Sequence, residues 1–148
     1  FVIKDDDYIS DVIVRTDAAL ITLAKRVIPQ LLSGTLDPIM QNEDDATYLL
    51  MRTPEDGKIK WDQSAKDIEL LIRSVSKPYP GAYALYENKS VVFWKAKAVK
   101  NDIYIGLPGQ IAYKDSERIG VVCKDGILEV FEYNCDDDCK FRIGHKFK

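Results

Sequence analysis

The period of the apolar residues changes once along this chain, and that change constrains the fold more than any other feature. In two stretches before residue 76, apolar side chains recur at three- and four-residue intervals, which is the spacing of one helix face. After residue 81 they alternate, which is the spacing of strands with one buried side. Helices followed by short alternating strands predict an α+β fold.

The first helical stretch runs from Ile9 to Leu31, and its apolar residues form one stripe. Gly34 predicts its end, and Pro29 predicts a kink in its last turns because proline removes a backbone donor. Asp5–Asp7 offers a helix cap, and Phe1–Lys4 reads as the end of a strand. Since so short a strand cannot cover the stripe, we expect it to pack on a sheet outside these residues. The stripe consists of Ile9, Val12, Ile13, Leu20, Leu23, Ala24, Val27 and Leu31.

A linker and a second helix are predicted next. Residues 35–60 show neither period and are rich in turn residues, as a connection between two domains would be, with Ala46–Met51 extended. Ser64 and Asp67 then match a capping box. The buried face of the helix that they begin is predicted to be Ala65, Ile68, Leu71, Ile72 and Val75.

The alternating part predicts several short strands, which favours a small barrel or sandwich. Asp125-Gly126 is a hairpin signal between the last two strands. In the longest strand we expect Val92, Trp94, Ala96 and Ala98 on one face, and Val91, Phe93, Lys95, Lys97 and Val99 on the other. The predicted strands are Ala82–Tyr86, Val91–Val99, Ile103–Ile105, Gln110–Tyr113, Arg118–Cys123 and Ile127–Tyr133.

Charge and hydropathy exclude two classes of protein. The net charge of −3 is not that of a dedicated nucleic-acid binder. It is uneven: residues 1–50 carry a balance of −5, residues 51–148 one of +2, and the last nine residues hold four cations. Any contact with a polyanion is therefore expected in the second part. No apolar run approaches the ~20 residues of a membrane span.

Three cations are candidate substrate-binding residues. Lys95 and Lys97 share a strand face with Phe93, so they fit either phosphate binding or a solvated edge. Arg73 fits either a partner of the helix dipole or an ion pair between domains. Trp94 fits a core position, with nucleobase stacking as the alternative.

The cysteines leave two interpretations open. Cys135 and Cys139 flank Asp136–Asp138, and with His145 they would give three ligands of a zinc site. The alternative is an acidic surface turn with two thiols and a disordered basic tail. A disulfide is not expected in a cytosolic protein. We predict no metal site.

No catalytic residue is predicted either. The chain has one histidine, and its sequence contains no Asn-x-His and no glycine-rich phosphate loop.

An ordered series of short motifs resembles the linker and C-terminal region of the methionyl-tRNA formyltransferase family. The motifs are Gln41-Asn42-Glu43, Ala46-Thr47-Tyr48, Arg52-Thr53-Pro54-Glu55-Asp56-Gly57, Ile59-Lys60-Trp61, Ala65, Ile68, Ile72-Arg73, Pro80-Gly81-Ala82, Trp94-Lys95-Ala96, Pro108-Gly109-Gln110-Ile111 and Asp125-Gly126-Ile127-Leu128.

The resemblance implies an arrangement of four parts. Residues 1–34 would be the last strand end and helix of a Rossmann-like catalytic domain, and residues 35–60 a linker. Residues 61–134 would form a helix with a small OB-like barrel, followed by a basic tail at 135–148. The family's catalytic residues would precede Phe1, so none can be assigned here.

The resemblance also implies a function. The parent protein would be a cytoplasmic enzyme that transfers a formyl group from 10-formyltetrahydrofolate, bound mainly by the N-terminal catalytic domain, to an amine. The expected acceptor is methionyl-tRNA, with a nucleotide-linked amino sugar as the alternative. A stand-alone OB-type module that binds nucleic acid or protein is the alternative of another class. The exposed face of the first helix would favour a homodimer.

Overall fold

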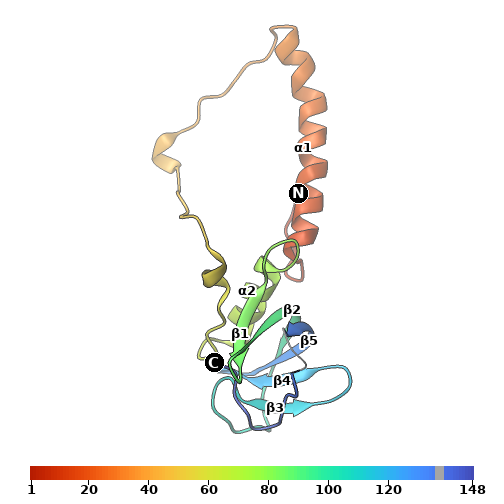
Figure 1. The fold of residues 1–148 in the computed structure, drawn as a ribbon. Coiled ribbons are helices and arrows are strands. Elements are labelled where there is room, and N and C mark those ends of the chain that lie inside the picture. Colours follow the sequence, from red (N-terminus) through yellow and green to blue (C-terminus); the bar gives the residue numbers. More distant parts are fainter. Residues whose placement is uncertain (136–138) are drawn as a thin grey trace. The chain divides into compact units, whose positions relative to one another are not determined.

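The computed structural model describes residues 1–135 and 139–148. They form two compact units, Phe1–Arg52 and Thr53–Lys148. Figure 1 shows the first unit in red to yellow and the second mainly in green to blue. The division falls inside the predicted linker of residues 35–60, because its last residues join the second unit, where Gly57 and Ile59 are buried.

The first unit contains helix α1 (Ile9–Leu32), which confirms the first predicted helix. α1 continues through Pro29 and ends before Gly34, which has a φ of +69°. Its N-terminal cap differs from the prediction: the Asp11 carboxylate accepts the backbone N–H of Tyr8 at 2.9 Å. Asp7 instead forms an ion pair with Arg15. No strand is assigned at residues 1–4. The strand end expected there stays a prediction, because its partner strands would lie in the sheet expected outside these residues.

The apolar stripe of α1 is not sealed. No residue of α1 is buried, and the side chains of Leu20 and Leu31 are 56% and 62% exposed. Beyond α1 the first unit contains one short 3₁₀ helix, η1 (Glu43–Asp45), and an irregular stretch to Arg52. A covering sheet outside these residues therefore stays a prediction.

The second unit is built on one antiparallel sheet of five strands in the order β1-β2-β5-β4-β3. Five of the six predicted strands are confirmed. The sixth, Ile103–Ile105, is wrong, because the Asn101 side chain binds both the N–H and the C=O of Tyr104, at 2.8 and 2.6 Å. The observed strands are β1 (Ala82–Tyr86), β2 (Lys89–Val99), β3 (Ile111–Lys114), β4 (Ile119–Val122) and β5 (Ile127–Cys135).

An irregularity in β2 changes which side chains face the core. The register against β5 shifts between Phe93 and Lys95 and again between Lys95 and Ala96. Such a bulge reverses the alternation beyond it. Phe93 and Ala96 are therefore both buried, and the predicted face that combined Phe93 with the lysines is wrong. Lys95 and Lys97 do share the exposed face.

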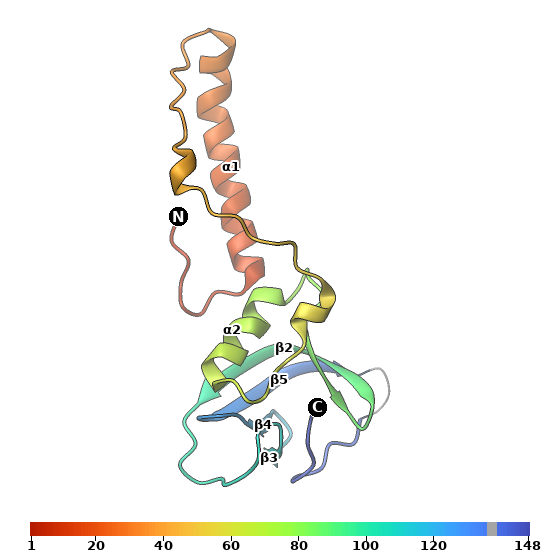
Figure 2. The ribbon, with the colours of Figure 1, turned by 90° about the vertical axis from the view of Figure 1, so that its left-hand side faces the viewer.

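Helix α2 (Ala65–Val75) covers the sheet and confirms the second predicted helix. Figure 2 shows it lying along β2 and β5. The Ser64 hydroxyl accepts the Asp67 N–H at 3.0 Å, as predicted, and Asp125 of the β4–β5 hairpin also accepts the Ala65 N–H at 3.0 Å. The predicted apolar face packs inward, with Ala65, Ile68 and Ile72 buried. A short 3₁₀ helix, η2 (Pro54–Gly57), precedes α2.

Residues 141–148, here named the closing segment, connect the two edges of the sheet. On the β1 side, Leu85 and Lys148 exchange two backbone hydrogen bonds of 2.8 Å. On the β3 side, the Ile111 N–H donates to His145 at 2.9 Å, and the Phe147 N–H donates to Gly109 at 2.9 Å. The predicted disordered tail is therefore wrong for these residues.

Aromatic rings anchor the closing segment in the core. Phe147 is fully buried, and its ring centroid lies 5.4 Å from that of Trp61 and 5.5 Å from that of Phe93. Phe141 is also buried, with its ring 4.9 Å from Tyr86. Burial of such rings contributes a few kcal/mol each, roughly 2 to 3. The sequence pattern missed this segment because its two core residues are separated by five polar or exposed positions.

Candidate functional site

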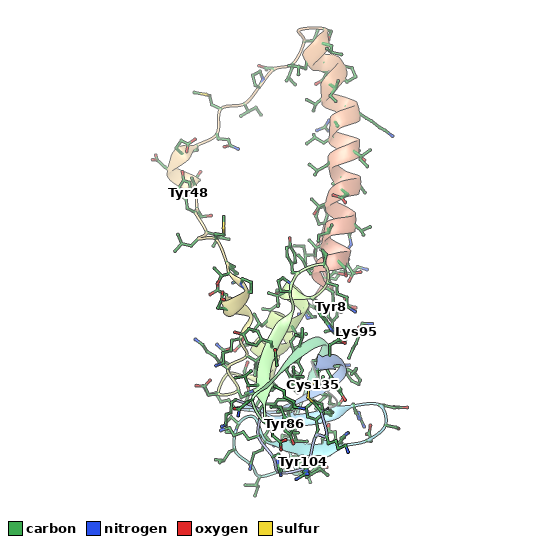
Figure 3. The ribbon with its side chains drawn as sticks, in the orientation of Figure 1. Tyr8, Tyr48, Tyr86, Lys95, Tyr104 and Cys135 are labelled. Atoms are coloured by element: carbon green, nitrogen blue, oxygen red, sulfur yellow. A yellow bond between two sulfur atoms is a disulfide. The ribbon has the colours of Figure 1, made fainter. Side chains whose placement is uncertain are left out.

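Two lysines and one carboxylate form a cluster on the outer side of the sheet. Lys77 Nζ lies 2.9 Å from Glu132 Oε1, and Lys95 Nζ lies 3.4 Å from Glu132 Oε2. Lys95 and Glu132 are paired across β2 and β5, and the Lys95 side chain points outward (Figure 3). The hydrogen bond from Lys77, followed by that from Lys95, holds the pKa of Glu132 below its ordinary value.

Trp94 lies beside this cluster rather than in the core. Lys77 Nζ is 5.0 Å from the centroid of the Trp94 ring, within the range of a cation–π contact. The ring also lies against Gly81, where an added Cβ would come within 2.8 Å of its Cζ3 atom. A nucleobase that stacked on the face under Lys77 would have to displace that lysine.

A shallow groove of about 280 Å³ continues from Gly81 along the same part of the second unit. Apolar and small side chains from η2, β1 and β2 line it, and Tyr83 and Ser90 bring hydroxyl groups. The full lining is Pro54, Glu55, Pro80, Gly81, Tyr83, Ser90 and Val92.

Lys97 lies opposite Glu129 across β2 and β5. It is exposed, and among the described residues no ion pair to it is present. Lys95 and Lys97 therefore place two ammonium groups along one strand face, as predicted. Their role in substrate binding stays a prediction.

Arg73 belongs to a different network. Its Nε lies 3.6 Å from Glu69 Oε1 on α2, and its side chain is only 12% exposed. The other oxygen, Glu69 Oε2, accepts the backbone N–H of Ala98 in β2 at 2.9 Å. The structure therefore places Arg73 beside the carboxylate that holds α2 on the sheet, in a network separate from that of Lys95.

A second polar network, which the sequence pattern did not reveal, surrounds Glu129. This carboxylate is 8% exposed and accepts the Tyr113 hydroxyl at 2.6 Å and Arg118 Nη1 at 2.8 Å. Burial, together with this hydrogen bond, raises the pKa of Tyr113 well above its ordinary value. The available signal in the sequence was Glu129 itself, an acidic residue among the apolar residues that begin β5.

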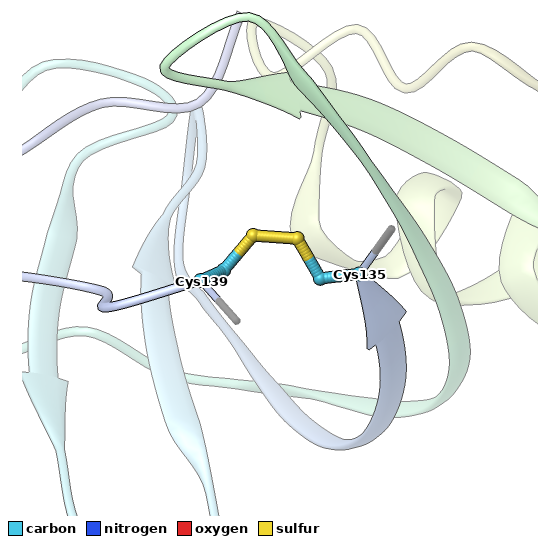
Figure 4. Close-up of a disulfide and its surroundings, with 2 residues drawn as sticks. All are labelled: Cys135 and Cys139. Carbon is cyan, nitrogen blue, oxygen red and sulfur yellow. A yellow bond between two sulfur atoms is a disulfide. The ribbon is translucent and has the colours of Figure 1, made fainter. Parts of the chain in front are cut away.

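The zinc interpretation of Cys135, Cys139 and His145 is not supported. The two cysteines are joined by a disulfide (Figure 4), contrary to the expectation of two thiols. His145 Nδ1 lies 3.4 Å from Glu87 at the surface. Within residues 1–135 and 139–148, no three ligand side chains gather that could hold a metal ion. The predicted acidic turn, Asp136–Asp138, lies outside the described residues.

The cluster can attract an anion, but it offers no groups for formyl transfer. That reaction needs a base for the proton of the amine and a donor for the oxyanion. His145, the only imidazole, pairs with an exposed glutamate on another part of the unit.

No helix in the described part of the chain is long and apolar enough to cross a membrane.

A family model described as "Formyl transferase, C-terminal domain" matches residues 52–140. The chain belongs to this family. The match begins one residue before the second unit, so the formyl transferase C-terminal domain corresponds to that unit, most of which it covers. The prediction of a C-terminal portion of a formyltransferase family protein is confirmed.

Two solved structures, both of variants of HypX from Aquifex aeolicus, are similar in fold to this chain. The match to the first has a TM-score of 0.67 and a sequence identity of 18%, and it covers 88% of this chain and 23% of the HypX chain. The match to the second has a TM-score of 0.62 and a sequence identity of 18%, and it covers 80% of this chain and 20% of the HypX chain. The chain thus spans about a fifth of the length of these proteins.

Proposed function

We propose that this chain is the C-terminal part of an enzyme that transfers a formyl group from 10-formyltetrahydrofolate to an amine. The family match over residues 52–140 is the observation that carries the proposal. In this proposal a Rossmann-like N-terminal domain holds the folate and the catalytic residues and covers the stripe of α1. We further infer that the sheet closed by residues 141–148 is an OB-like barrel, and that the enzyme is cytoplasmic.

The second unit would then help to hold the acceptor. Methionyl-tRNA is the acceptor we propose, because Lys77, Lys95 and Lys97 give cations on one side of the unit. A nucleotide-linked amino sugar is the second candidate. It needs fewer cations, and Glu132 already engages two of these lysines.

An activity measurement tests whether the catalytic residues lie in the other domain. The 148-residue chain is incubated with 10-formyltetrahydrofolate and methionyl-tRNA, and formylmethionyl-tRNA is quantified. We expect no product, because the base and the oxyanion donors would lie in the other domain. Folate-dependent turnover by this chain alone would contradict that assignment.

Binding of tRNA as a function of salt tests the acceptor. Replacing both Lys95 and Lys97 by alanine should reduce the salt dependence of tRNA affinity by about two units of slope if both contact phosphates. Lys124→Ala, on the β4–β5 hairpin, is the matched control and should leave the slope unchanged. Glu132→Gln should increase the salt dependence of tRNA affinity, because it removes a negative charge between Lys77 and Lys95.

The outcomes separate three functions. An unchanged slope in the double variant would exclude a phosphate contact at these lysines. An absence of tRNA binding at low salt would favour the amino-sugar nucleotide. A stand-alone OB-type module would instead bind single-stranded oligonucleotides in a mobility shift, and a flat titration would exclude it.

A further inference from the structure

A second row of apolar side chains runs along α1, apart from the stripe. Val14, Ile21 and Ile28 follow one another at seven-residue intervals, and they are 68%, 56% and 52% exposed. Seven residues make almost two turns, so the three side chains lie within about 20° of one line along the helix. That line is about 100° around the helix from Leu20 of the stripe. A sheet that covered the stripe would leave this row in water.

Two opposite charges flank the row at equal distances from Ile21. Asp17 lies four residues before Ile21 and Lys25 four residues after it, each about 40° from the row and on opposite sides of it. No residue of opposite charge lies three or four positions along the helix from either of them. Neither forms an ion pair with another of the described residues. Their charges are therefore open to a partner outside this chain.

The order of these residues selects the direction of a second, identical helix. In a parallel pair every residue is level with its own copy, so Asp17 would face Asp17 of the partner subunit. In an antiparallel pair centred on Ile21, the residues equally far before and after Ile21 become level. Asp17 then faces Lys25 of the partner subunit, and Val14 faces Ile28 of the partner subunit. The row is thus self-complementary about a two-fold axis, as a symmetric dimer requires.

We propose that α1 pairs with α1 of a second copy of this chain, antiparallel, about a two-fold axis at Ile21. The contact buries the row of Val14, Ile21 and Ile28 from both copies and forms two ion pairs between Asp17 and Lys25. Helices that carry apolar residues on more than one side are normally covered on each. The stripe stays available for the sheet proposed above, so this dimer goes beyond the formyl-transfer proposal and does not depend on it.

Cysteine cross-linking of the 148-residue chain tests the geometry. Ile21→Cys should form a disulfide-linked dimer under mild oxidation, because the residue on the axis meets its own copy. Val14→Cys and Ile28→Cys should each stay monomeric when oxidised alone, because the two copies of either residue are about 21 Å apart along the pair. An equal mixture of these two variants should give the dimer on a non-reducing gel.

Thr22→Cys is the matched control for the cross-linking. It lies one residue beyond Ile21 and about 100° away from the row, so it should cross-link no more than the native chain. The native cysteines do not interfere, because Cys123 is buried and the other two are bonded to each other.

Charge reversal tests the ion pairs, in a Leu20→Glu background that suppresses association through the stripe. Asp17→Lys or Lys25→Asp alone should raise the dissociation constant of the dimer at least about twofold, because two attractions become two repulsions. Combining both reversals should restore the starting value, since level residues again carry opposite charges. Sedimentation over a concentration series measures each constant.

Three results would overturn the proposal. The first is cross-linking of Val14→Cys or Ile28→Cys alone as readily as Ile21→Cys, which would indicate a parallel pair. The second is a yield from Ile21→Cys no higher than that from Thr22→Cys. The third is a double reversal that binds no better than the single ones. None of these measurements uses a folate or an acceptor, so failure of the formyl-transfer proposal would leave them unchanged.

Discussion

The Tyr113 ring passes over Gly120, and its hydroxyl donates to Glu129. This contact depends on the missing Cβ of Gly120. The three residues lie on neighbouring strands, with Gly120 paired to both others. A Cβ on Gly120 would lie 2.3 Å from the Tyr113 ring. The missing side chain therefore leaves the space in which the ring lies, while Arg118 and Tyr113 satisfy the buried carboxylate.

Tyr113→Phe should change the stability of the protein at alkaline pH. The folded state holds the Tyr113 pKa above its ordinary value of 10.0. Above that pH the unfolded chain has lost a proton that the folded protein keeps, so the free energy of unfolding falls as pH rises. Denaturant unfolding should show a shallower alkaline decline in Tyr113→Phe than in the native chain.

The matched control is Tyr79→Phe, because Tyr79 is half exposed. Its alkaline limb should follow that of the native chain. Identical slopes in all three proteins would contradict a raised pKa at Tyr113.

At the scale of elements, one carboxylate links α2 to the sheet. β1 pairs with β2 only as far as Phe93. Within the described part of the chain, the next part of that edge of β2 has no strand beside it. Glu69 of α2 provides the acceptor for Ala98 there and lies beside Arg73. The helix therefore substitutes locally for a strand.

Glu69→Ala should destabilise the unit by about 1 to 3 kcal/mol, because it leaves a partly buried backbone donor without its charged acceptor. Urea unfolding measures the change. Lys66→Ala on the exposed side of α2 is the control and should stay within about 0.5 kcal/mol of the native chain. A loss in Glu69→Ala no larger than in Lys66→Ala would show that the Ala98 contact contributes nothing.

The closing segment gives the second prediction at this scale. Phe147→Ala should cost about 3 to 5 kcal/mol, because it removes a fully buried ring from an aromatic cluster. Ile143→Ala lies in the same segment with 65% of the side chain exposed, and it should be nearly neutral. Thermal unfolding of both variants checks the difference; equal losses would mean that the segment is not part of the core.

Local patterns predicted the elements well where one period ruled and poorly where contacts between distant residues decided. The α2 cap and the Asp125-Gly126 hairpin were readable because their signals lie within a few residues. The bulge at Trp94 was not, since it is defined by the register against β5. The bonds of the closing segment join residues up to 63 positions apart, such as Leu85 and Lys148, and no local period reports them.

At the scale of the whole molecule, the two units differ in how far they bury their apolar residues. The second unit has a continuous core. The first has a helix with no buried residue. The candidate site was predictable only in part. The shared face of Lys95 and Lys97 follows from the alternation of a strand, whereas Glu132 and Lys77 join these lysines only through tertiary contacts.

The stripe of α1 should make the chain self-associate. Leu20→Glu, at the centre of the stripe, should weaken association at least about tenfold, because burying an unpaired carboxylate costs more than about 1.4 kcal/mol. Thr22→Glu on the opposite side of the helix is the control. Sedimentation over a concentration series measures both, and equal weakening by the two substitutions would exclude the stripe as the contact.

The order of the strands along the chain has a consequence for synthesis. β1 and β3 are both complete before residues 141–148 emerge, so the nascent protein presents two unsatisfied strand edges until the closing segment is made. Such edges are templates for pairing with other chains. Proteolytic removal of residues 141–148 would expose both edges again, and aggregation is the expected result.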